Sequence, residues 1–324
     1  MQMLNLARTV FTITFFYSII SAQNTCGPSI GSCAANECCS SAGNCGTTSD
    51  HCAAPGCQTE FGPACDANKT PLGLNTSSIP RGKLGSVLYG GGGIYACNSV
   101  GDVALTFDDG PSQYTGHVLD LLDQYQAKAT FFVTGINNGK GAIDTTSQWS
   151  SLIQRMYTSG HQIASHSWSH ADLSKISQTQ RRNEMIKNEM ALRNILGVIP
   201  TYMRPPYSSC TAESGCTADM EDLGYHVTYF DLDTQDYLND SPDKIEIPKN
   251  IFDRAIGSKS PTNGDFLAIA HDIHEQTSSQ LVEHMLQGLR SSGYRAVTVG
   301  TCLGDPKENW YRPGSSTLGF RMRT

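Results

Sequence analysis

The residues best suited to chemistry are acidic and histidine side chains that follow short apolar runs. Asp108 and Asp109 follow the run VALTF, and His166 and His170, four residues apart, follow the run QIAS. Two imidazoles at this spacing share one face if the segment is helical, and they suit a borderline divalent metal. With Asp109 they would offer two nitrogens and one oxygen and leave positions open for water. Such a ligand set is typical of catalytic rather than structural metal sites.

Three further motifs also follow apolar runs. They are RPPY, which begins at Arg204, DLDTQDY, which contains Asp233, and AHD, which contains His271. Taken alone, these are ordinarily a rigid turn, a helix cap and a hydrogen-bonded core histidine. The paired aspartates and histidines are likewise ordinarily a solvated turn and unrelated surface residues. Because all five motifs stand at the ends of successive apolar runs, they indicate one shared site.

Seven apolar, β-rich runs must position these residues. They cover residues 103–107, 129–133, 162–165, 201–204, 227–231, 266–270 and 295–299. Stretches with helical spacing alternate with them, including residues 181–196, which end at Gly197. Strands that alternate with helices predict parallel βα units, and seven is one short of the usual barrel. We therefore expect an α/β fold, a distorted (β/α)7 barrel with its chemistry at the carboxyl ends of the strands.

The organisation of the chain follows from its N-terminus and from cysteine density. A charged residue, the apolar run 10–20 and a small residue at position 22 predict a secretory signal peptide over residues 1–22. A membrane anchor is the alternative, but the apolar run is short for a span. Eight of twelve cysteines lie within residues 26–65. We expect a disulfide-rich module at 23–66, a Gly/Ser-rich flexible linker at 67–96, a catalytic domain at 97–305 and a C-terminal tail at 306–324.

Net charge excludes some partners. The formal charge is −7 and no Lys/Arg run occurs, so nucleic acid and anionic membranes are not expected partners. We expect a monomer that is secreted and is extracellular or associated with a cell wall. Three N-glycosylation sequons, at Asn68, Asn75 and Asn239, fit that compartment.

In this order, the five motifs resemble those of the NodB-type polysaccharide deacetylase family (carbohydrate esterase family four): TFDDGP, H(S/T)xxH, RxPY, DxxDW and LxH. The resemblance covers roughly residues 97–302, and VALTFDDGPS, RPPY and AHDIH most resemble the fungal chitin deacetylase branch. It implies a metal, expected to be Zn²⁺ with Co²⁺ or Mn²⁺ as alternatives, held by Asp109, His166 and His170. It also implies a general base, Asp108, paired with Arg204, and a general acid, His271, whose pKa is raised by Asp233.

The resemblance further implies a substrate groove. The backbone N–H of Tyr207 would stabilise the oxyanion, Ile269 would line the acetyl pocket, and Trp168 and Tyr237 would form walls. Two positions depart from the family pattern: Tyr237 replaces a Trp and Ile269 replaces a Leu. Both changes keep the side-chain character, so we expect altered walls and retained chemistry.

The cysteine-rich segment resembles hevein-type chitin-binding modules. The resemblance implies the pairs Cys26–Cys39, Cys33–Cys45, Cys38–Cys52 and Cys57–Cys65; a zinc module or a toxin-like knot are the alternatives. From their positions we also expect Cys97–Cys302, at the two ends of the domain, and Cys210–Cys216. The family's sugar-binding face maps onto Ser40, Ala42, Asn44 and His51, and three aromatic residues are missing from it. We therefore expect weak chitin binding by this module.

These features together predict a secreted metal-dependent hydrolase that removes N-acetyl groups from chitin or chito-oligosaccharides. Acetyl-xylan or peptidoglycan are alternative substrates. A non-catalytic protein that masks chitin is a different class, but it would tolerate loss of the acidic and histidine residues that this chain keeps. A non-haem iron oxygenase also uses two histidines and one carboxylate, yet the second aspartate and His271 fit hydrolysis better.

Overall fold

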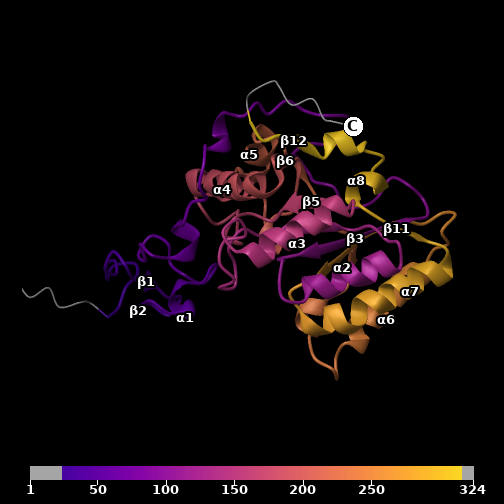
Figure 1. The fold of residues 1–324 in the computed structure, drawn as a ribbon, viewed down its shortest axis with the longest axis horizontal. Coiled ribbons are helices and arrows are strands. Elements are labelled where there is room, and N and C mark those ends of the chain that lie inside the picture. Colours follow the sequence, from indigo (N-terminus) through magenta and orange to yellow (C-terminus); the bar gives the residue numbers. More distant parts are fainter. Residues whose placement is uncertain (1–23, 316–324) are drawn as a thin grey trace, which may run out of the picture.

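The computed structural model describes residues 24–315 of the chain (Figure 1). A small N-terminal module lies beside a larger α/β domain, and the predicted signal peptide lies outside the described residues. Within residues 24–315, no helix has the length and apolar character needed to cross a membrane.

The domain is built on one parallel sheet. Its strands are β3 (Asp102–Asp108), β4 (Thr130–Val133), β5 (Gln162–Ser165), β7 (Tyr202–Met203), β8 (His226–Val227), β9 (Leu232–Asp233), β10 (Phe266–His271) and β11 (Arg295–Val297). The order is β8-β7-β5-β4-β3-β10-β9, and β11 pairs with the start of β3. Only residues 228–231 join β8 to β9, so the two outer strands lie near each other and the sheet must curl. The predicted distorted barrel is confirmed, although only Val227 of the predicted strand 227–231 lies in a strand, at the end of β8.

Helices cover the outer face of the curled sheet (Figure 1). They are α2 (Thr115–Gln124), α3 (Ser147–Thr158), α4 (Gln178–Leu196), α5 (Cys216–Asp222), α6 (Glu246–Gly257), α7 (Val282–Ser292) and the short α8 (Val299–Cys302). The longest, α4, starts at a capping box formed by Ser177 and Gln180 and ends at Gly197, whose φ is 76°. Buried apolar side chains of β3 and β4, such as Leu105 and Phe131, pack against the helices and form the core.

The segment 67–96 is not a flexible linker. It carries the short helix η2 (Thr76–Ser78) and buries Ile79, Tyr89 and Ile94. Arg81 forms an ion pair with the buried Glu189 of α4, at 2.5 Å. The glycines that suggested flexibility instead allow close approach: a Cβ on Gly93 would lie 2.3 Å from the ring of Tyr229.

Residues 306–313 belong to the domain rather than to a tail. The strand β12 (Tyr311–Pro313) pairs antiparallel with β6 (Val198–Pro200). Trp310 is buried, and the Tyr311 hydroxyl accepts a hydrogen bond from the backbone N–H of Ile163 at 2.8 Å. The aromatic pair Trp310–Tyr311 is the sequence signal that an apolar surface is covered here.

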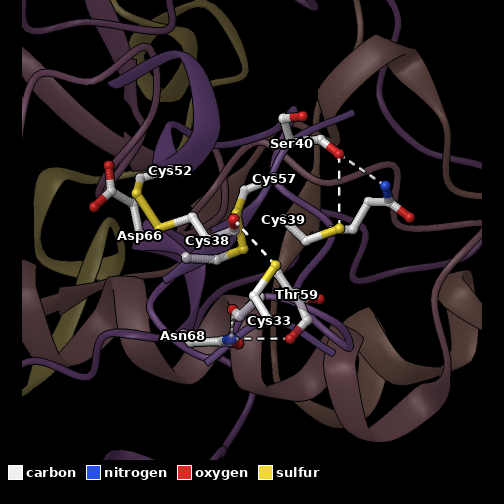
Figure 2. Close-up of a disulfide and its surroundings, with 12 residues drawn as sticks. Cys33, Cys38, Cys39, Ser40, Cys52, Cys57, Thr59, Asp66 and Asn68 are labelled. Carbon is white, nitrogen blue, oxygen red and sulfur yellow. Dashed lines mark hydrogen bonds between the residues drawn. A yellow bond between two sulfur atoms is a disulfide. The ribbon is translucent and has the colours of Figure 1, made fainter. Parts of the chain in front are cut away.

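The module has little secondary structure: β1 (Cys38–Cys39), β2 (Cys45–Gly46), α1 (Ser49–Cys52) and the 3-10 turn η1 (Asp66–Asn68). Disulfides hold it together (Figure 2). All six disulfides form with the expected pairing: Cys26–Cys39, Cys33–Cys45, Cys38–Cys52, Cys57–Cys65, Cys97–Cys302 and Cys210–Cys216. Because every cysteine is bonded, the alternative of a zinc module is wrong.

Candidate active site

The carboxyl ends of β3, β5 and β10, with the loop after β7, surround a pocket of about 300 Å³. Most of the predicted site residues line it, namely Asp108, Asp109, His166, His170, Arg204, Tyr207, Tyr237, Ile269 and His271. Parallel pairing puts His271 of β10 in register with Asp108 of β3. The topology therefore places the predicted acid and base next to each other at one edge of the sheet.

Three side chains at the pocket floor form a candidate metal centre. The Oδ1 atom of Asp109 lies 3.0 Å from Nε2 of His170 and 3.5 Å from Nε2 of His166. Neighbouring ligands of a tetrahedral zinc ion, bound at about 2.1 Å, are about 3.4 Å apart. The Nδ1 atom of His166 contacts the carbonyl oxygen of Arg204 at 2.7 Å, which orients the ring with Nε2 facing Asp109.

The charge state of these groups also fits a cation. Burial lowers the pKa of His166 to about 4, so the imidazole is neutral and keeps a lone pair for a metal. Burial alone would raise the pKa of Asp109, but the imidazole of His170, whose Nε2 lies 3.0 Å away, outweighs it and lowers this pKa. Among the described residues, Asp109 Oδ1 is buried without a hydrogen-bond donor. A cation would satisfy this oxygen, so the residues present fit a divalent metal.

The backbone at this centre is in an unusual conformation. Asp109, His170 and Tyr207 have φ values of 74°, 62° and 58°, in the left-handed region that non-glycine residues rarely adopt. Such a conformation persists only where surrounding contacts enforce it, and it clusters at functional sites.

Lys140, which sequence reasoning missed, supplies part of that enforcement. Its ammonium donates hydrogen bonds at 3.0 Å to the carbonyl oxygens of Asp109 and Gly110 and to the hydroxyl of Thr134. The Thr134 hydroxyl also donates to the Asp109 carbonyl, at 2.6 Å. Burial lowers the pKa of Lys140 to about 7, against the opposing charges of Asp272 and Asp109. A lone lysine in the loop GINNGK carried no signal of this role.

The predicted pair of Asp108 and Arg204 is present. Nη1 of Arg204 donates to Oδ1 of Asp108 at 2.7 Å, and both side chains are buried. The guanidinium also donates to the Thr106 hydroxyl and the Tyr229 carbonyl and lies 4.2 Å from the ring of Phe132. It is fixed on all sides, so it holds one carboxylate oxygen while the other, Oδ2, lies 3.8 Å from Nε2 of His166.

The partner of His271 is Asp236, so the prediction of Asp233 is wrong. Nδ1 of His271 lies 2.8 Å from Oδ1 of Asp236, whose Oδ2 accepts hydrogen bonds from the His271 backbone and the Thr277 hydroxyl. Asp233 instead accepts from the Tyr237 hydroxyl at 3.2 Å and the Gln235 backbone. Gln235, with a φ of 58°, turns the chain between the two aspartates, and this turn brings the second one under His271. Although burial disfavours the imidazolium, the charge of Asp236 raises the pKa of His271 to about 10.

Comparison with known proteins agrees with this geometry. Residues 96–228 match the Polysaccharide deacetylase family, and residues 25–65 match the Chitin recognition protein family. A chitin deacetylase of Colletotrichum lindemuthianum is 42% identical over 219 residues, which cover 68% of this chain and 86% of that one. A chitin deacetylase of Pestalotiopsis sp is 40% identical, with 76% of each chain covered. The chain belongs to the polysaccharide deacetylase family.

Solved structures place the fold in the same family. The chitin deacetylase structure from Colletotrichum lindemuthianum matches this polysaccharide deacetylase with a TM-score of 0.67 and 40% identity, covering 72% of this chain and all of that one. The Bc1960 peptidoglycan N-acetylglucosamine deacetylase matches with a TM-score of 0.55 and 27% identity, covering 68% and 95%. The family match ends at residue 228, so the positions of Asp236 and His271 in this polysaccharide deacetylase come from the geometry above.

The walls of the pocket differ in one respect from the prediction. Tyr207 and Tyr237 line it and are 60% and 47% exposed, and Ile269 contributes a largely buried apolar surface. Trp168 is wrong as a wall, because its side chain is fully buried and its ring fills the space above Gly135, where a Cβ would lie 2.0 Å away. Four unpredicted residues line the pocket as well: Pro205, Ser208, Phe230 and His274. The motif AHDIH contains His274, so its three-residue spacing from His271 was the available signal.

The module's expected sugar-binding face lacks a flat aromatic surface. Ser40 is buried, and its hydroxyl accepts a hydrogen bond from the Asn44 backbone at 3.1 Å. Ala42 and Asn44 are exposed, and Nδ1 of His51 contacts the Thr48 hydroxyl at 2.8 Å. Weak chitin binding by this face stays a prediction.

Proposed function

We propose that the protein hydrolyses the N-acetyl groups of chitin or chito-oligosaccharides, giving acetate and free amines, with Zn²⁺ held by Asp109, His166 and His170. The observation that carries this proposal is the placement of Asp108 and His271 on neighbouring strand ends beside these three ligands. A carboxylate and a protonated imidazole on one pocket can serve as base and acid for amide hydrolysis.

Each residue has a defined task in the proposed reaction. A bound metal supplies Lewis acidity toward the acetyl carbonyl and lowers the pKa of water. Asp108, fixed by Arg204, accepts the proton as the water oxygen adds to the carbonyl carbon. The backbone N–H of Tyr207 donates to the developing oxyanion. His271 then gives its proton to the amide nitrogen as the C–N bond breaks, since an amine anion cannot leave. Ile269 supports the acetyl methyl group.

The substrate class rests on two independent features. The match to chitin recognition proteins favours chitin over acetyl-xylan, and two relatives about 40% identical are chitin deacetylases. Peptidoglycan is the second candidate, because a probable peptidoglycan-N-acetylglucosamine deacetylase of Arthroderma benhamiae is 40% identical, although this chain covers half of it. Six disulfides in a chain of this size favour an oxidising, extracellular location.

The experiment measures acetate release from N-acetylglucosamine oligomers, peptidoglycan and acetyl-xylan by the full chain. We expect the oligomers to be the best substrates, with activity lost on chelation and restored by zinc. Asp108→Asn should lose activity while it keeps its metal. If acetate release from the oligomers is absent or does not respond to the chelator, the proposal is wrong. If acetate release is faster from peptidoglycan or acetyl-xylan, that polymer is the substrate instead.

A further inference from the structure

A second and larger hollow lies between the module and the domain. Its volume is about 890 Å³, compared with about 300 Å³ for the catalytic pocket. One wall is the module segment 55–61, and the other is the first half of α4 with the loop that follows His170. We call this hollow the interdomain groove.

The interdomain groove adjoins the catalytic pocket. Tyr207 lines both hollows. Ser169 and Ala171, the neighbours of the metal-ligand candidate His170 on each side, line the groove as well. A polymer with one sugar at the metal centre would therefore pass Tyr207 on its way toward the module.

Contacts across the two walls hold the groove in shape. The backbone N–H of Asn138 donates to the Ala54 carbonyl at 2.8 Å, and the Lys187 ammonium donates to the Ala67 carbonyl at 2.8 Å. Gly139 faces the module so closely that a Cβ would lie 2.5 Å from the Ser49 hydroxyl. These contacts come from loops and a helix at separate places, which argues for a built cleft rather than an incidental gap.

The chemistry of the walls suits a polar polymer with amide and amine groups. Gln58 and Asn183 offer amides, Glu60 and Asp172 offer carboxylates, and Phe61 offers a partly buried ring. Amides can pair with hydroxyl and N-acetyl groups, and carboxylates suit the ammonium groups left after deacetylation. The residues of the module's expected sugar-binding face do not line this groove.

We propose that the module forms one wall of the substrate cleft, so that the chitin chain extends from the metal centre into the interdomain groove. The module then contributes sugar-binding sites to catalysis through residues 55–61, independently of its aromatic-poor face. This inference rests on the proposed function. It assigns a binding site to the sugars of the polymer that lie beyond the metal centre.

The test uses substitutions in the full chain that place a larger side chain in the interdomain groove, one from each wall. Asn183 is exposed on α4, and its side chain forms no hydrogen bond with the residues that the structure describes, so Asn183→Trp adds bulk without removing one. Glu60→Trp adds bulk from the module and removes one long hydrogen bond, in which Glu60 accepts from the Gln180 side-chain amide at 3.4 Å. Asn250→Trp, at an exposed position of α6 outside the groove, is the matched control.

We expect both groove variants to lose at least tenfold in kcat/KM on an N-acetylglucosamine hexamer and less than twofold on the dimer, while the control changes neither. In an Asp108→Asn background, which prevents turnover, hexamer Kd should rise at least tenfold in the same two variants. Equal kinetics of groove and control variants on the hexamer overturn the inference but leave the proposed function intact. Absence of acetate release by the wild-type chain overturns both.

Discussion

Replacing Asp236 by Asn is the most direct test of His271 as the general acid. The carboxylate is buried and contacts Nδ1 of His271 at 2.8 Å, and its charge holds the pKa of that imidazole at about 10. The wild-type acid is therefore protonated throughout the neutral range. The amide cannot supply the charge, and burial then disfavours the imidazolium.

The expected size of the effect follows from the fraction of protonated acid. If the pKa of His271 falls from about 10 to its ordinary value of 6.5, about 3% of the imidazole is protonated at pH 8. Because burial lowers the pKa of the unpaired imidazole further, kcat/KM should then fall at least about 30-fold at pH 8, and by less at pH 6. A metal cation nearby lowers the pKa of His271 in the wild type and in the variant alike. The comparison is therefore between the alkaline limbs of their two pH profiles.

The assay is the pH dependence of kcat/KM for acetate release between pH 5 and 10, as about ten points. Asp233→Asn is the control, because Asp233 contacts Tyr237 and Gln235 but not His271. Thermal unfolding separates a catalytic effect from a folding defect, since Asp236 also accepts from Thr277. A shifted alkaline limb in Asp233→Asn with an unchanged one in Asp236→Asn would refute the assignment.

Three further perturbations have defined outcomes. Chelation should abolish acetate release and zinc should restore it, whereas His170→Ala should not recover at the same zinc concentration; equal recovery contradicts the ligand assignment. Lys140→Met should weaken metal affinity by about 10- to 100-fold, measured by competition with a chromophoric chelator, because the loop carrying Asp109 loses two hydrogen bonds; unchanged affinity contradicts this. Removing Cys97–Cys302, which closes 205 residues, should lower the free energy of unfolding by about 5 kcal/mol on chain-entropy grounds, against about 2 kcal/mol for Cys210–Cys216, which closes 6. Similar losses of stability for the two pairs would contradict the entropic account.

The parts of the site that sequence predicted well share one property: their positions follow from strand ends. Asp108, His166 and His271 each stand at or just after the end of a buried strand, and parallel strands place those ends together. Periodicity also predicted α4 and its end at Gly197, because a left-handed cap needs glycine. Residue types and chain direction were sufficient here.

The errors arise where side-chain direction depends on a turn. Asp233 and Asp236 are three residues apart in the chain, and only the left-handed turn at Gln235 decides which one lies under His271. Trp168 stands between two pocket histidines in sequence, yet its ring points into the core beside Gly135. Aromatic character alone does not distinguish a groove wall from a core residue.

Composition misled the prediction of segment 67–96 for a related reason. Glycine favours both flexible chains and close backbone approach, and these uses give the same composition. Gly90 and Gly93 serve the second, since Cβ atoms there would lie 2.5 Å from Glu221 and 2.3 Å from Tyr229. Burial of Ile79 and Ile94 beside them fixes the segment against the domain.

The base Asp108 and the acid His271 stand on the paired strands β3 and β10, and each has a partner of opposite charge. Register places Asp108 beside His271, so the base and the acid face the same pocket and each needs a partner that fixes its role. Arg204 supplies a permanent positive charge on the side of Asp108, and Asp236 supplies a negative charge on the side of His271. Asp236 favours the charged form of His271, so the proton stays on the imidazole, while Arg204 holds the Asp108 carboxylate in place by a buried ion pair. The division of acid and base roles thus depends on two buried ion pairs, and removing either partner should damage catalysis without moving a metal ligand.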